Sequence, residues 1–361
     1  MTATVAVVGA GAAGAAAAYA LRDEPVDVTV FEKSGGLCGR AATRRRGDCT
    51  YEYGANYLTS DDERVTELVT EALPTDGLVD VTEPVWTFDA AGEISEGDRG
   101  DGHKWTYEDG ITQLAKRLFA ATDATVHRNT RVATLASADG GWTVEDAVEQ
   151  SSTSPRSSSS REDADVTDHG HFDAALLTPP APQSADLLGQ ARWDHVDCRR
   201  LRESIASVPY RAVVSAVLHY DFELDLPYYA LVNADRDHDV GWVGREECKP
   251  GHVPDGEALL LVQMAPDWSA ERFHDPEDEV VADAAEATAA LLSDDRLADP
   301  DWTDYQGWRY ALPDEGVSDD AIEMAADHDL FLAGDWVAGE ARLHAAIRNG
   351  LETGERIAEA L

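Results

Sequence analysis

The hydrophobic pattern at the beginning of the chain predicts a strand, a tight turn, a helix and a second strand. Residues 4–8 form an apolar, β-branched run with the length of a buried strand. Glycines recur through residues 9–14, and residues 15–21 are small, apolar and favourable for a helix. Residues 26–31 form a second apolar run, which ends at Glu32. This order predicts a β-α-β unit with a glycine-rich first turn.

Apolar periodicity elsewhere predicts a succession of further helices and strands. Helical spacing occurs at residues 61–74, 109–118, 277–292 and 344–360. Runs rich in strand-forming residues predict strands at 124–127, 130–135, 171–180, 212–219, 228–232, 258–263 and 329–336, with a hairpin at 140–144. We expect the strand at 171–180 to complete the domain that the first β-α-β unit begins.

A serine-rich polar segment interrupts this pattern at residues 150–168. It holds too few apolar side chains to offset the entropy lost on ordering. We interpret it as a flexible surface loop inserted into a hairpin, and the alternative is a linker between domains.

The chain is strongly negative, and this charge indicates the kind of solution in which the protein works. Asp and Glu number 70 against 29 Lys and Arg, a net charge of −41, and only four of the basic residues are lysine. A basic face for nucleic acid is therefore not expected. At about 1 M salt the Debye length is roughly 3 Å, which screens such self-repulsion. The composition indicates a protein of a salt-rich cytoplasm, as in an extreme halophile; the alternative is an ordinary acidic protein.

Other compositional features exclude several classes of protein. The chain has no apolar run of membrane-spanning length and does not begin with a secretory signal, so we expect a cytoplasmic protein without a membrane span. None of the four cysteines belongs to a CxxC pair, and no histidines cluster near them. We therefore expect free thiols rather than disulfides, and no metal site.

The glycine-rich turn has the spacing of a dinucleotide-binding fingerprint. Gly9 permits a tight turn, Gly11 leaves room for a pyrophosphate beside the backbone, and Gly14 lets the helix pack close to the strand. The helix N-terminus offers N–H groups and partial positive charge to the phosphates. Glu32, at the end of the second strand, can accept hydrogen bonds from ribose hydroxyls. The alternative is a glycine-rich turn in an α/β protein without a nucleotide.

A second glycine-rich loop favours FAD over NAD. It runs through residues 33–40 and ends in Gly39 and Arg40, whose guanidinium suits a diphosphate. Residues 53–59 follow shortly afterwards with the sequence Tyr-Gly-Ala-Asn-Tyr-Leu-Thr.

These segments together resemble the flavin-dependent oxidoreductases of the glutathione-reductase-like fold. The resemblance lies in the amine-oxidase branch and is greatest to renalase-like proteins, including prokaryotic ones. Residues 31–45, 53–59, 308–313 and 332–336 carry it, so it extends over nearly the whole chain. One departure is Cys38, at a position where the pattern has glycine, because a Cys adopts a positive φ less easily.

The resemblance implies an α/β protein whose Rossmann FAD domain is interrupted by a smaller α+β substrate domain with a mixed sheet. It assigns residues 1–60, 108–185 and 325–361 to the FAD domain, and residues 61–107 and 186–324 to the substrate domain. The flavin ring would lie at their interface. Non-covalent FAD contacts are implied for Gly9, Ala10, Gly11, Ala12, Ala13, Gly14, Glu32, Lys33, Gly39, Arg40, Gly54, Ala55, Asn56, Tyr57, Val132, Gly334, Asp335, His344, Ala345 and Ala346.

Some residues are candidates for contact with the substrate rather than with FAD. Asn56 and Tyr57 follow the second FAD segment, and Trp308, Arg309 and Tyr310 combine aromatic faces with a cation. The alternative for the aromatic residues is a packing role in the core. The basic run at residues 44–46 either attracts a phosphate-bearing substrate or pairs with acidic side chains. Lys249 is the lysine of the middle region, and we assign it no role at the flavin.

The resemblance also implies a reaction. A hydride would pass from the substrate to flavin N5, and dioxygen would reoxidise the flavin. The substrate would be a small molecule, specifically a dihydro isomer of NAD(P), whose oxidation needs no acid–base residue. The alternatives are oxidation of an amine, desaturation of a carotenoid or other isoprenoid, and a flavoprotein without catalysis. An amine oxidase would have an apolar aromatic cage, and a desaturase would have a long apolar tunnel.

Overall fold

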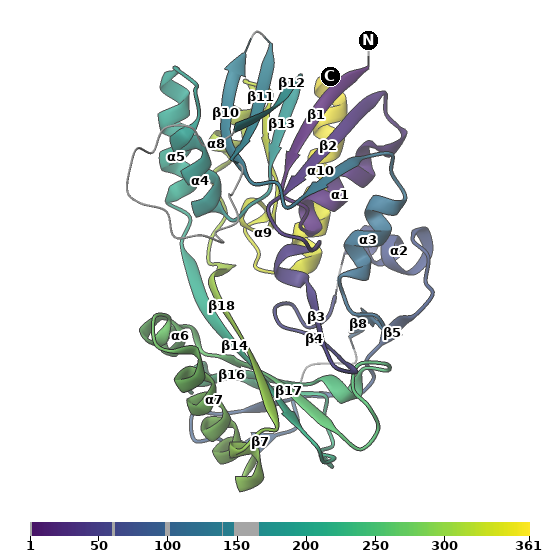
Figure 1. The fold of residues 1–361 in the computed structure, drawn as a ribbon, viewed down its shortest axis with the longest axis vertical. Helices are drawn as coiled ribbons and strands as arrows, with labels where there is room; N and C mark the ends of the chain where they lie inside the picture. The colour runs from purple at the N-terminus through teal and green to yellow at the C-terminus, as the bar shows by residue number, and fades with distance from the viewer. Residues whose placement is uncertain (1, 60–61, 98–101, 139, 148–165) are drawn as a thin grey trace, which may run out of the picture. The chain divides into compact units, whose positions relative to one another are not determined.

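The computed structural model describes all residues except 1, 60–61, 98–101, 139 and 148–165 (Figure 1). The chain divides into two compact units. Unit 1 comprises Met1–Gly39, Ala115–Pro209 and Asp314–Leu361, and unit 2 comprises Arg40–Leu114 and Tyr210–Pro313.

These boundaries differ from the expected ones chiefly at residues 40–60 and 186–209. Residues 40–60 lie in unit 2 because Cys49 and Tyr51 pack against Val217, Leu259 and Leu261 of that unit's sheet. Residues 186–209 lie in unit 1, where they form the second half of one helix, residues 181–190, and all of another, residues 196–206.

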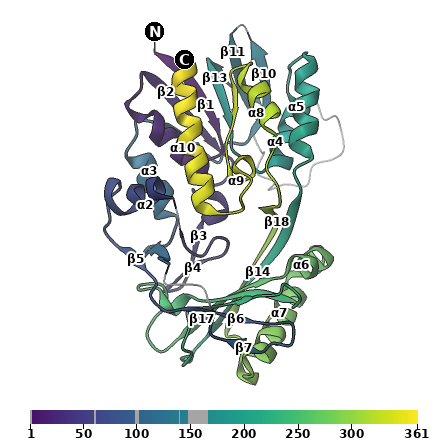
Figure 2. The same cartoon turned by 180° about the vertical axis from the view of Figure 1, so that it is seen from behind.

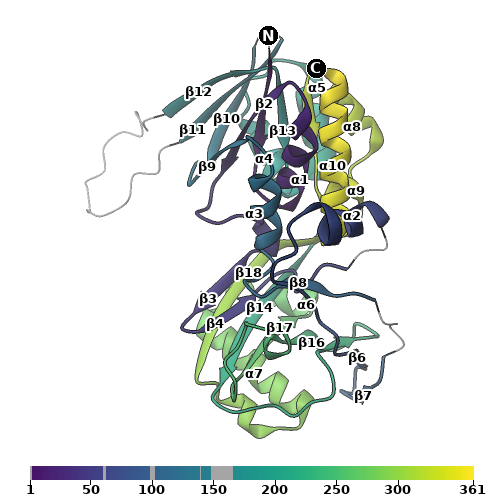
Figure 3. The ribbon, with the colours of Figure 1, turned by 90° about the vertical axis from the view of Figure 1, so that its right-hand side faces the viewer.

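Unit 1 is built on a five-stranded parallel sheet in the order β19-β13-β1-β2-β9. Helices α1 and α10 lie on one side of this sheet and a three-stranded antiparallel sheet, β10-β11-β12, lies on the other (Figures 2 and 3). The strands are β1 (Ala3–Val8), β2 (Val26–Glu32), β9 (Thr125–Arg128), β10 (Val132–Ala138), β11 (Gly141–Ala147), β12 (Val166–Phe172), β13 (Ala174–Leu177) and β19 (Leu330–Leu332). The helices are α1 (Ala12–Ala20), α4 (Ala181–Gln190), α5 (Val196–Ala206), α8 (Asp319–Ala326), α9 (Asp335–Ala338) and α10 (Leu343–Ala360), and α3 (Gln113–Ala120) begins at the boundary with unit 2.

Small residues let α1 and α10 approach closely. A Cβ at Gly350 of α10 would lie 2.3 Å from the carbonyl oxygen of Ala13, and one at Gly354 would lie 2.7 Å from that of Ala17. Alanines occupy most of α1 and are buried. The run of small residues after the glycine turn therefore serves helix packing.

Unit 2 is built on a seven-stranded mixed sheet in the order β18-β14-β17-β16-β15-β6-β7. All neighbouring pairs are antiparallel except β15 and β6. The strands of this sheet are β6 (Val85–Phe88), β7 (Ile94–Ser95), β14 (Tyr210–Tyr220), β15 (Ala230–Asn233), β16 (Val240–Arg245), β17 (Ala258–Met264) and β18 (Trp302–Pro313). The hairpin β3 (Thr43–Arg46) with β4 (Cys49–Glu52) and the antiparallel pair β5 (Leu78–Asp80) with β8 (Trp105–Tyr107) accompany it. The α-helices beside it are α2 (Glu63–Glu67), α6 (Pro266–Arg272) and α7 (Glu277–Leu292).

Strand β14 shows why the two faces of this sheet differ. Val214, Ala216 and Leu218 belong to the core that includes α7, whereas Val217 packs with Cys49 of hairpin β3–β4. Successive side chains of a strand point to opposite faces. The odd-numbered side chains of β14, including that of His219, therefore share the face that meets the hairpin.

Several predicted elements differ in detail from the structure. The strand predicted at 171–180 is two strands, β12 and β13, which meet at Asp173, whose carboxylate accepts hydrogen bonds from the backbone N–H of Thr4 (2.7 Å) and from its hydroxyl (2.8 Å). The helix predicted at 61–74 is the short α2 followed by a π-helix at Leu68–Ala72. The loop predicted at 150–168 lies outside the described residues as far as 165, and residues 166–168 belong to β12. Among the described helices, none has the length and apolar character needed to cross a membrane.

Candidate functional site

The glycine-rich turn of unit 1 connects β1 to α1. Gly9 has φ +101°, a conformation that favours glycine. A Cβ at Gly14 would lie 2.2 Å from the carbonyl oxygen of Gly9, so only glycine allows this approach of helix and turn. Within the described residues, no atom beyond its own chain neighbours lies within 4 Å of the place where a Cβ of Gly11 would stand. The backbone at Gly11 is therefore open to a ligand.

Glu32 links the glycine turn to the loop that follows β2. Its side chain is buried; one carboxylate oxygen accepts from the backbone N–H of Ala10 (2.8 Å), and the other accepts from the N–H (2.8 Å) and hydroxyl (2.7 Å) of Ser34. A carboxylate offers about four acceptor positions. Glu32 therefore both holds this loop and keeps capacity for a ribose hydroxyl, and the first of these roles was not foreseen.

Cys38 connects the loop after β2 to the glycine turn. Its φ is +75°, so a non-glycine residue occupies the left-handed region where the family pattern has glycine. The Cys38 N–H donates to the carbonyl of Ala10 at 2.9 Å, and Gly39 also has a positive φ of 56°. The loop through residues 33–39 is thus attached to the glycine turn by backbone contacts.

The end of the chain contributes a second group of residues at the same edge of the parallel sheet. Glycine turns follow both β1 and β19, and the carboxyl ends of parallel strands meet at one edge. Gly334 donates its N–H to Asn349 Oδ1 at 2.9 Å, and the buried Asp335 begins α9. Trp336 Nε1 and His344 Nδ1 are buried and have no hydrogen-bond partner within the described residues. The open space at Gly11 can admit a pyrophosphate, and the two unpaired nitrogens can form hydrogen bonds to a cofactor, so this part of unit 1 fits a dinucleotide.

The predicted FAD residues that lie in unit 2 form their own compact group. The guanidinium of Arg40 donates to the carbonyl of Ala311 (2.8 Å), and the carbonyl of Arg40 accepts from the N–H of Ala55 (3.0 Å). A Cβ at Gly54 would lie 2.0 Å from that same carbonyl oxygen. Gln263 Nε2 donates to the carbonyl of Gly54 at 2.7 Å. These contacts hold the segment 54–57 in place.

Strand β18 separates the three candidates that the sequence grouped together. Trp308 stacks on Tyr53 with ring centroids 5.4 Å apart and donates its indole N–H to the Tyr53 carbonyl at 2.7 Å. Tyr310 contacts the ring of Tyr210. The guanidinium of Arg309 lies 5.3 Å from the ring centroid of Phe273 and is exposed. Alternation along the strand puts Arg309 on the other face from Trp308.

The basic run at residues 44–46 is engaged within unit 2. Arg44 forms an ion pair with Asp304 (3.0 Å) and lies over the ring of Tyr53, with its guanidinium carbon 4.1 Å from the centroid. Arg45 and Arg46 donate to the backbone carbonyls of Asp109 (2.6 Å) and Thr303 (2.7 Å). These contacts support the interpretation that residues 44–46 pair with groups of the protein rather than with a substrate phosphate.

An aromatic group with unpaired polar atoms surrounds Asn56 and Tyr57. The ring of Tyr57 lies 6.0 Å from that of Tyr229 and 6.1 Å from that of Trp242, centroid to centroid. Asn56 Oδ1, Tyr229 Oη and Trp242 Nε1 are buried without hydrogen-bond partners in the described part of the chain. A Cβ at Gly244 would lie 2.9 Å from Trp242 Nε1 and 3.7 Å from Asn56 Oδ1, so glycine lets the indole of Trp242 pack directly against the backbone there. We call Asn56, Tyr57, Tyr229 and Trp242 the aromatic site.

Tyr229 and Trp242 were not identified from the sequence. Tyr229 lies in the segment predicted as a strand at 228–232, and Trp242 lies in β16, where no separate strand was predicted. The packing of unit 2 brings both rings to Tyr57. Burial, with Glu246 as a further cause, raises the pKa of Tyr229 well above its ordinary value of 10. The phenol therefore stays neutral and able to donate a hydrogen bond.

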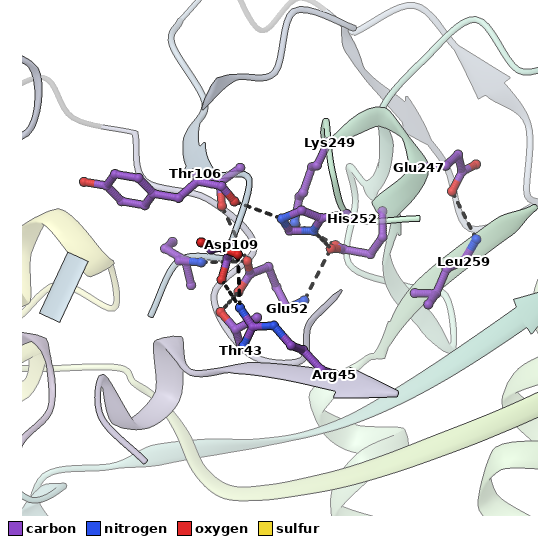
Figure 4. A network of polar contacts seen from close by, with 12 residues as sticks. Thr43, Arg45, Glu52, Thr106, Asp109, Glu247, Lys249, His252 and Leu259 are labelled. Atoms are coloured by element: carbon purple, nitrogen blue, oxygen red, sulfur yellow. Dashed lines mark hydrogen bonds and ion pairs between the residues drawn. The ribbon is translucent and has the colours of Figure 1, made fainter. Parts of the chain in front are cut away.

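A network of four titratable side chains lies next to the aromatic site, since Lys249 Nζ is 5.8 Å from the ring centroid of Tyr229. Figure 4 shows Glu52, Lys249 and His252 of this network. Glu52, Glu246, Lys249 and His252 are all almost completely buried. Lys249 Nζ lies 2.7 Å from one carboxylate oxygen of Glu246, and His252 Nδ1 lies 2.8 Å from the other. His252 Nε2 faces the carbonyl of Tyr107 at 3.0 Å. Lys249 is therefore a buried ion-pair residue, a role that its loop-like sequence did not indicate.

The two carboxylates of this network differ in their proton affinity. Burial raises the pKa of Glu52 to about 7, against the opposing charge of Lys249. Burial opposes ionisation of Glu246 as well, but Lys249 and His252 outweigh it and lower the pKa of that group. Glu52 instead accepts hydrogen bonds from the N–H of Ile111 (2.8 Å) and the hydroxyl of Thr43 (3.2 Å).

Glu52 should make stability fall as pH rises. Its ordinary pKa is 4.5, so between pH 4.5 and about 7 the folded protein holds a proton that the unfolded chain has lost. Raising the pH across this window is expected to lower the free energy of unfolding by about 3 kcal/mol. Urea denaturation of the wild type and Glu52→Gln at constant KCl measures this. The stability of the wild type should fall by about 3 kcal/mol relative to that of Glu52→Gln as the pH rises through this window, because glutamine stays neutral. Glu67→Gln, on an exposed face, should run parallel to the wild type. Parallel curves for Glu52→Gln would contradict the assignment.

Comparison with known proteins places this geometry in a family. Residues 7–72 match the NAD(P)-binding Rossmann-like domain, and residues 85–358 match the flavin containing amine oxidoreductases. The fold and the two matches define a flavin-dependent oxidoreductase. Because the second match covers most of the chain, the protein belongs to the flavin containing amine oxidoreductase family.

Individual relatives agree with this assignment. Protoporphyrinogen oxidase 2 of Arabidopsis thaliana is 40% identical over 65 residues, which are 18% of this chain and 13% of that protein. A provisionally named protoporphyrinogen oxidase structure from Exiguobacterium sp. is 14% identical with a TM-score of 0.77 and full coverage of both chains. Cyclohexylamine oxidase from Brevibacterium oxydans is 15% identical with a TM-score of 0.70 over 99% of both chains. The structural likenesses show a shared fold.

These findings confirm the expected fold class, a Rossmann FAD-binding domain with a mixed-sheet substrate domain. They also support the coarser part of the functional expectation, an FAD-dependent oxidoreductase acting on a small molecule. The family implies FAD, and the open backbone at Gly11 and the unpaired atoms of Trp336 and His344 fit that cofactor.

Proposed function

We propose that the protein oxidises a flat dihydropyridine carrying a carboxamide, of the kind found in dihydro isomers of NAD(P), with dioxygen as final electron acceptor. The observation that carries the proposal is the combination, in the aromatic site, of ring faces with unpaired buried polar atoms. A buried polar atom without a partner costs about 1–3 kcal/mol. A substrate that supplies the missing partners recovers this cost.

A carboxamide matches these atoms in kind. Its N–H can donate to Asn56 Oδ1, and its carbonyl oxygen can accept from Trp242 Nε1 and Tyr229 Oη. The faces of Tyr57 and Trp242 suit a flat ring. A site of this kind rejects an analogue that lacks the polar group, because its own atoms then stay unpaired.

The proposed reaction needs no catalytic acid or base, and the proposal gives the network beside the site no such role. A bound flavin supplies two-electron oxidation chemistry. A dihydropyridine that loses a hydride becomes a stable aromatic cation, so no proton has to be removed. Lys249 and His252 each contact the Glu246 carboxylate, and their role in the proposal is to support the residues of the aromatic site.

Oxidation of an amine is the second candidate, and the aromatic faces favour it. Three aromatic rings close together can surround a cationic or neutral amine. An ammonium group only donates hydrogen bonds. It would satisfy Asn56 Oδ1 and leave the indole N–H of Trp242 unpaired, which is why we rank this candidate second.

Anaerobic reduction of the purified holoenzyme in concentrated KCl tests the proposal. The flavin absorbance is followed after mixing with borohydride-reduced NAD+ isomers, and separately with a panel of primary amines. Bleaching by a dihydronicotinamide isomer, with peroxide released when air is admitted, is the expected result. Bleaching by amines alone would overturn the proposal in favour of amine oxidation, and bleaching by neither would remove both.

A variant of Asn56 tests which atoms recognise the substrate. Asn56→Leu keeps the size of the side chain and removes the amide. We expect the bleaching rate with the carboxamide substrate to fall by roughly 10- to 100-fold, the value of one hydrogen bond to a buried polar group. Arg309→Leu, on the other face of β18, is the matched control and should change the rate by less than about twofold. Equal rates for both variants would exclude Asn56 from recognition.

A further inference from the structure

Three side chains with metal-binding atoms meet in unit 2 at the junction of hairpin β3–β4 with the main sheet. They are Cys49 of β4, His219 of β14 and Glu257, which precedes β17. One ligand atom from each lies within 4.8 Å of the other two. Cys49 and His219 are buried, and the Glu257 side chain is 36% exposed.

The imidazole of His219 is held in one orientation. Its ring stacks on that of Trp302 with centroids 4.8 Å apart and planes 11° apart. Nε2 faces Glu257 Oε2 at 2.8 Å, which leaves Nδ1 on the opposite side of the ring. Nδ1 is buried without a hydrogen bond in the described part of the chain, and the nearest carboxylate, that of Asp301, lies 3.9 Å away.

We propose that Cys49, His219 and Glu257 form a binding site for a divalent transition metal, with Zn²⁺ as the preferred ion. Thiolate, imidazole and carboxylate are its ligand types, and hard cations such as Mg²⁺ avoid sulfur. His219 binds the metal through Nε2, and its Nδ1–H then points to Asp301. A carboxylate behind a metal-bound histidine is the usual way to fix the tautomer and orientation of that ring. In this arrangement His219 Nδ1, which lacks a hydrogen-bond partner in the described residues, would hold the ring in the orientation that the metal requires.

The metal would join elements that are distant in the chain. Cys49 belongs to the hairpin that continues into Glu52, Tyr53 and Gly54. His219 belongs to β14 of the main sheet, and Glu257 immediately precedes its neighbour β17. Three protein ligands leave a fourth position, which the exposed side of Glu257 opens to solvent. We assign the ion a structural role, because it would fasten the hairpin to the sheet. This inference does not depend on the proposed substrate.

A second cluster in unit 1 provides a contrast for the experiment. His195, Asp197 and His328 also lie close together, but they contain no thiol and are more exposed. His195 caps α5 through its own ring nitrogen, and Asp197 pairs with Arg200 and His328, so each contact there has an ordinary explanation. Only a site with Cys49 gives a thiolate signal with cobalt.

Cobalt titration of the chelator-treated holoenzyme in concentrated KCl tests the proposal. We expect one equivalent of Co²⁺ to produce a thiolate-to-cobalt charge-transfer band in the difference spectrum, with d–d bands to the red of the flavin absorption. Zn²⁺ should displace both. Cys49→Ser should lose the charge-transfer band and bind at least 100-fold more weakly, whereas Cys198→Ser, which alters a cysteine of unit 1, should match the wild type.

Two further variants keep the test decisive if Cys49→Ser fails to fold. Glu257→Gln alters a partly exposed side chain and should weaken binding without loss of flavin. Asp301→Asn should weaken it about 10- to 100-fold, the usual effect of removing the group behind a histidine ligand. Zn²⁺ should raise the unfolding temperature of the wild type and leave that of these variants nearly unchanged. Absence of a thiolate band in the wild type, or the same band in Cys49→Ser, would overturn the proposal.

Discussion

Replacing Lys249 with methionine is expected to destabilise the protein by about 3–5 kcal/mol. Lys249 Nζ and the Glu246 carboxylate are 2.7 Å apart, and neither side chain has any exposed surface. Removing the lysine would take away the cationic partner of the buried Glu246 carboxylate and leave His252 Nδ1, 2.8 Å away, as its remaining side-chain partner. A buried charge that loses its partner keeps its desolvation cost without the compensating attraction. Methionine fills similar space, so the loss would report on charge rather than on a cavity.

Urea denaturation at constant KCl concentration measures this effect. Lys116→Met is the matched control, because Lys116 is exposed on α3, and its stability should change by no more than about 0.5 kcal/mol. The double variant Glu246→Gln with Lys249→Met removes both charges of the pair and should recover much of the loss. If Lys249→Met were as stable as Lys116→Met, the buried ion pair would not exist in the folded protein.

Gly11→Val should nearly abolish flavin binding while the fold survives. The backbone at Gly11 has φ −73° and ψ −178°, which valine adopts, and no protein atom lies within 4 Å of its Cβ position. The added side chain would fill the space through which a pyrophosphate approaches the helix N-terminus. We expect FAD affinity to fall by at least about 100-fold, with a change of roughly 1 kcal/mol in the stability of the apoprotein.

Flavin stoichiometry and the dissociation constant of added FAD are the measurements. Gly14→Val gives a contrast. Its Cβ would collide with the Gly9 carbonyl, so the fold itself should be damaged. A Gly11→Val protein that retains one FAD per chain would exclude the glycine turn from cofactor binding.

The β-α-β unit could be predicted because its signals are local. The positive φ of Gly9 and the close approach at Gly14 depend on residues a few positions apart. Strand length, glycine spacing and the acidic residue at the end of β2 all lie within one short stretch of chain. The residues of this stretch therefore determine the fold class and the cofactor class together.

Candidate residues in unit 2 were predicted less completely because strand pairing decides their neighbours. Trp308 and Arg309 are adjacent in sequence, yet β18 sends them to opposite faces of the sheet. Asn56 and Tyr57 were identified from the segment 53–59, whereas Tyr229 and Trp242 belong to no sequence motif, although their rings lie close to that of Tyr57. The aromatic site exists because the pairing of β15 with β16 brings Tyr229, which immediately precedes β15, close to Trp242 of β16.

The sequence by itself determined the class of protein: the glycine turn, the acidic residue after β2 and the matching segments along the chain define a flavin-dependent oxidoreductase. The tertiary structure alone decided the contacts that distinguish this protein within that class. Glu52 meets Glu246, Lys249 and His252, and Cys49 meets His219, only after hairpin β3–β4 has packed on the main sheet. Local periodicity reports which face of an element is buried, but not which distant residue it is buried against. That partner is chosen by the packing of the whole domain.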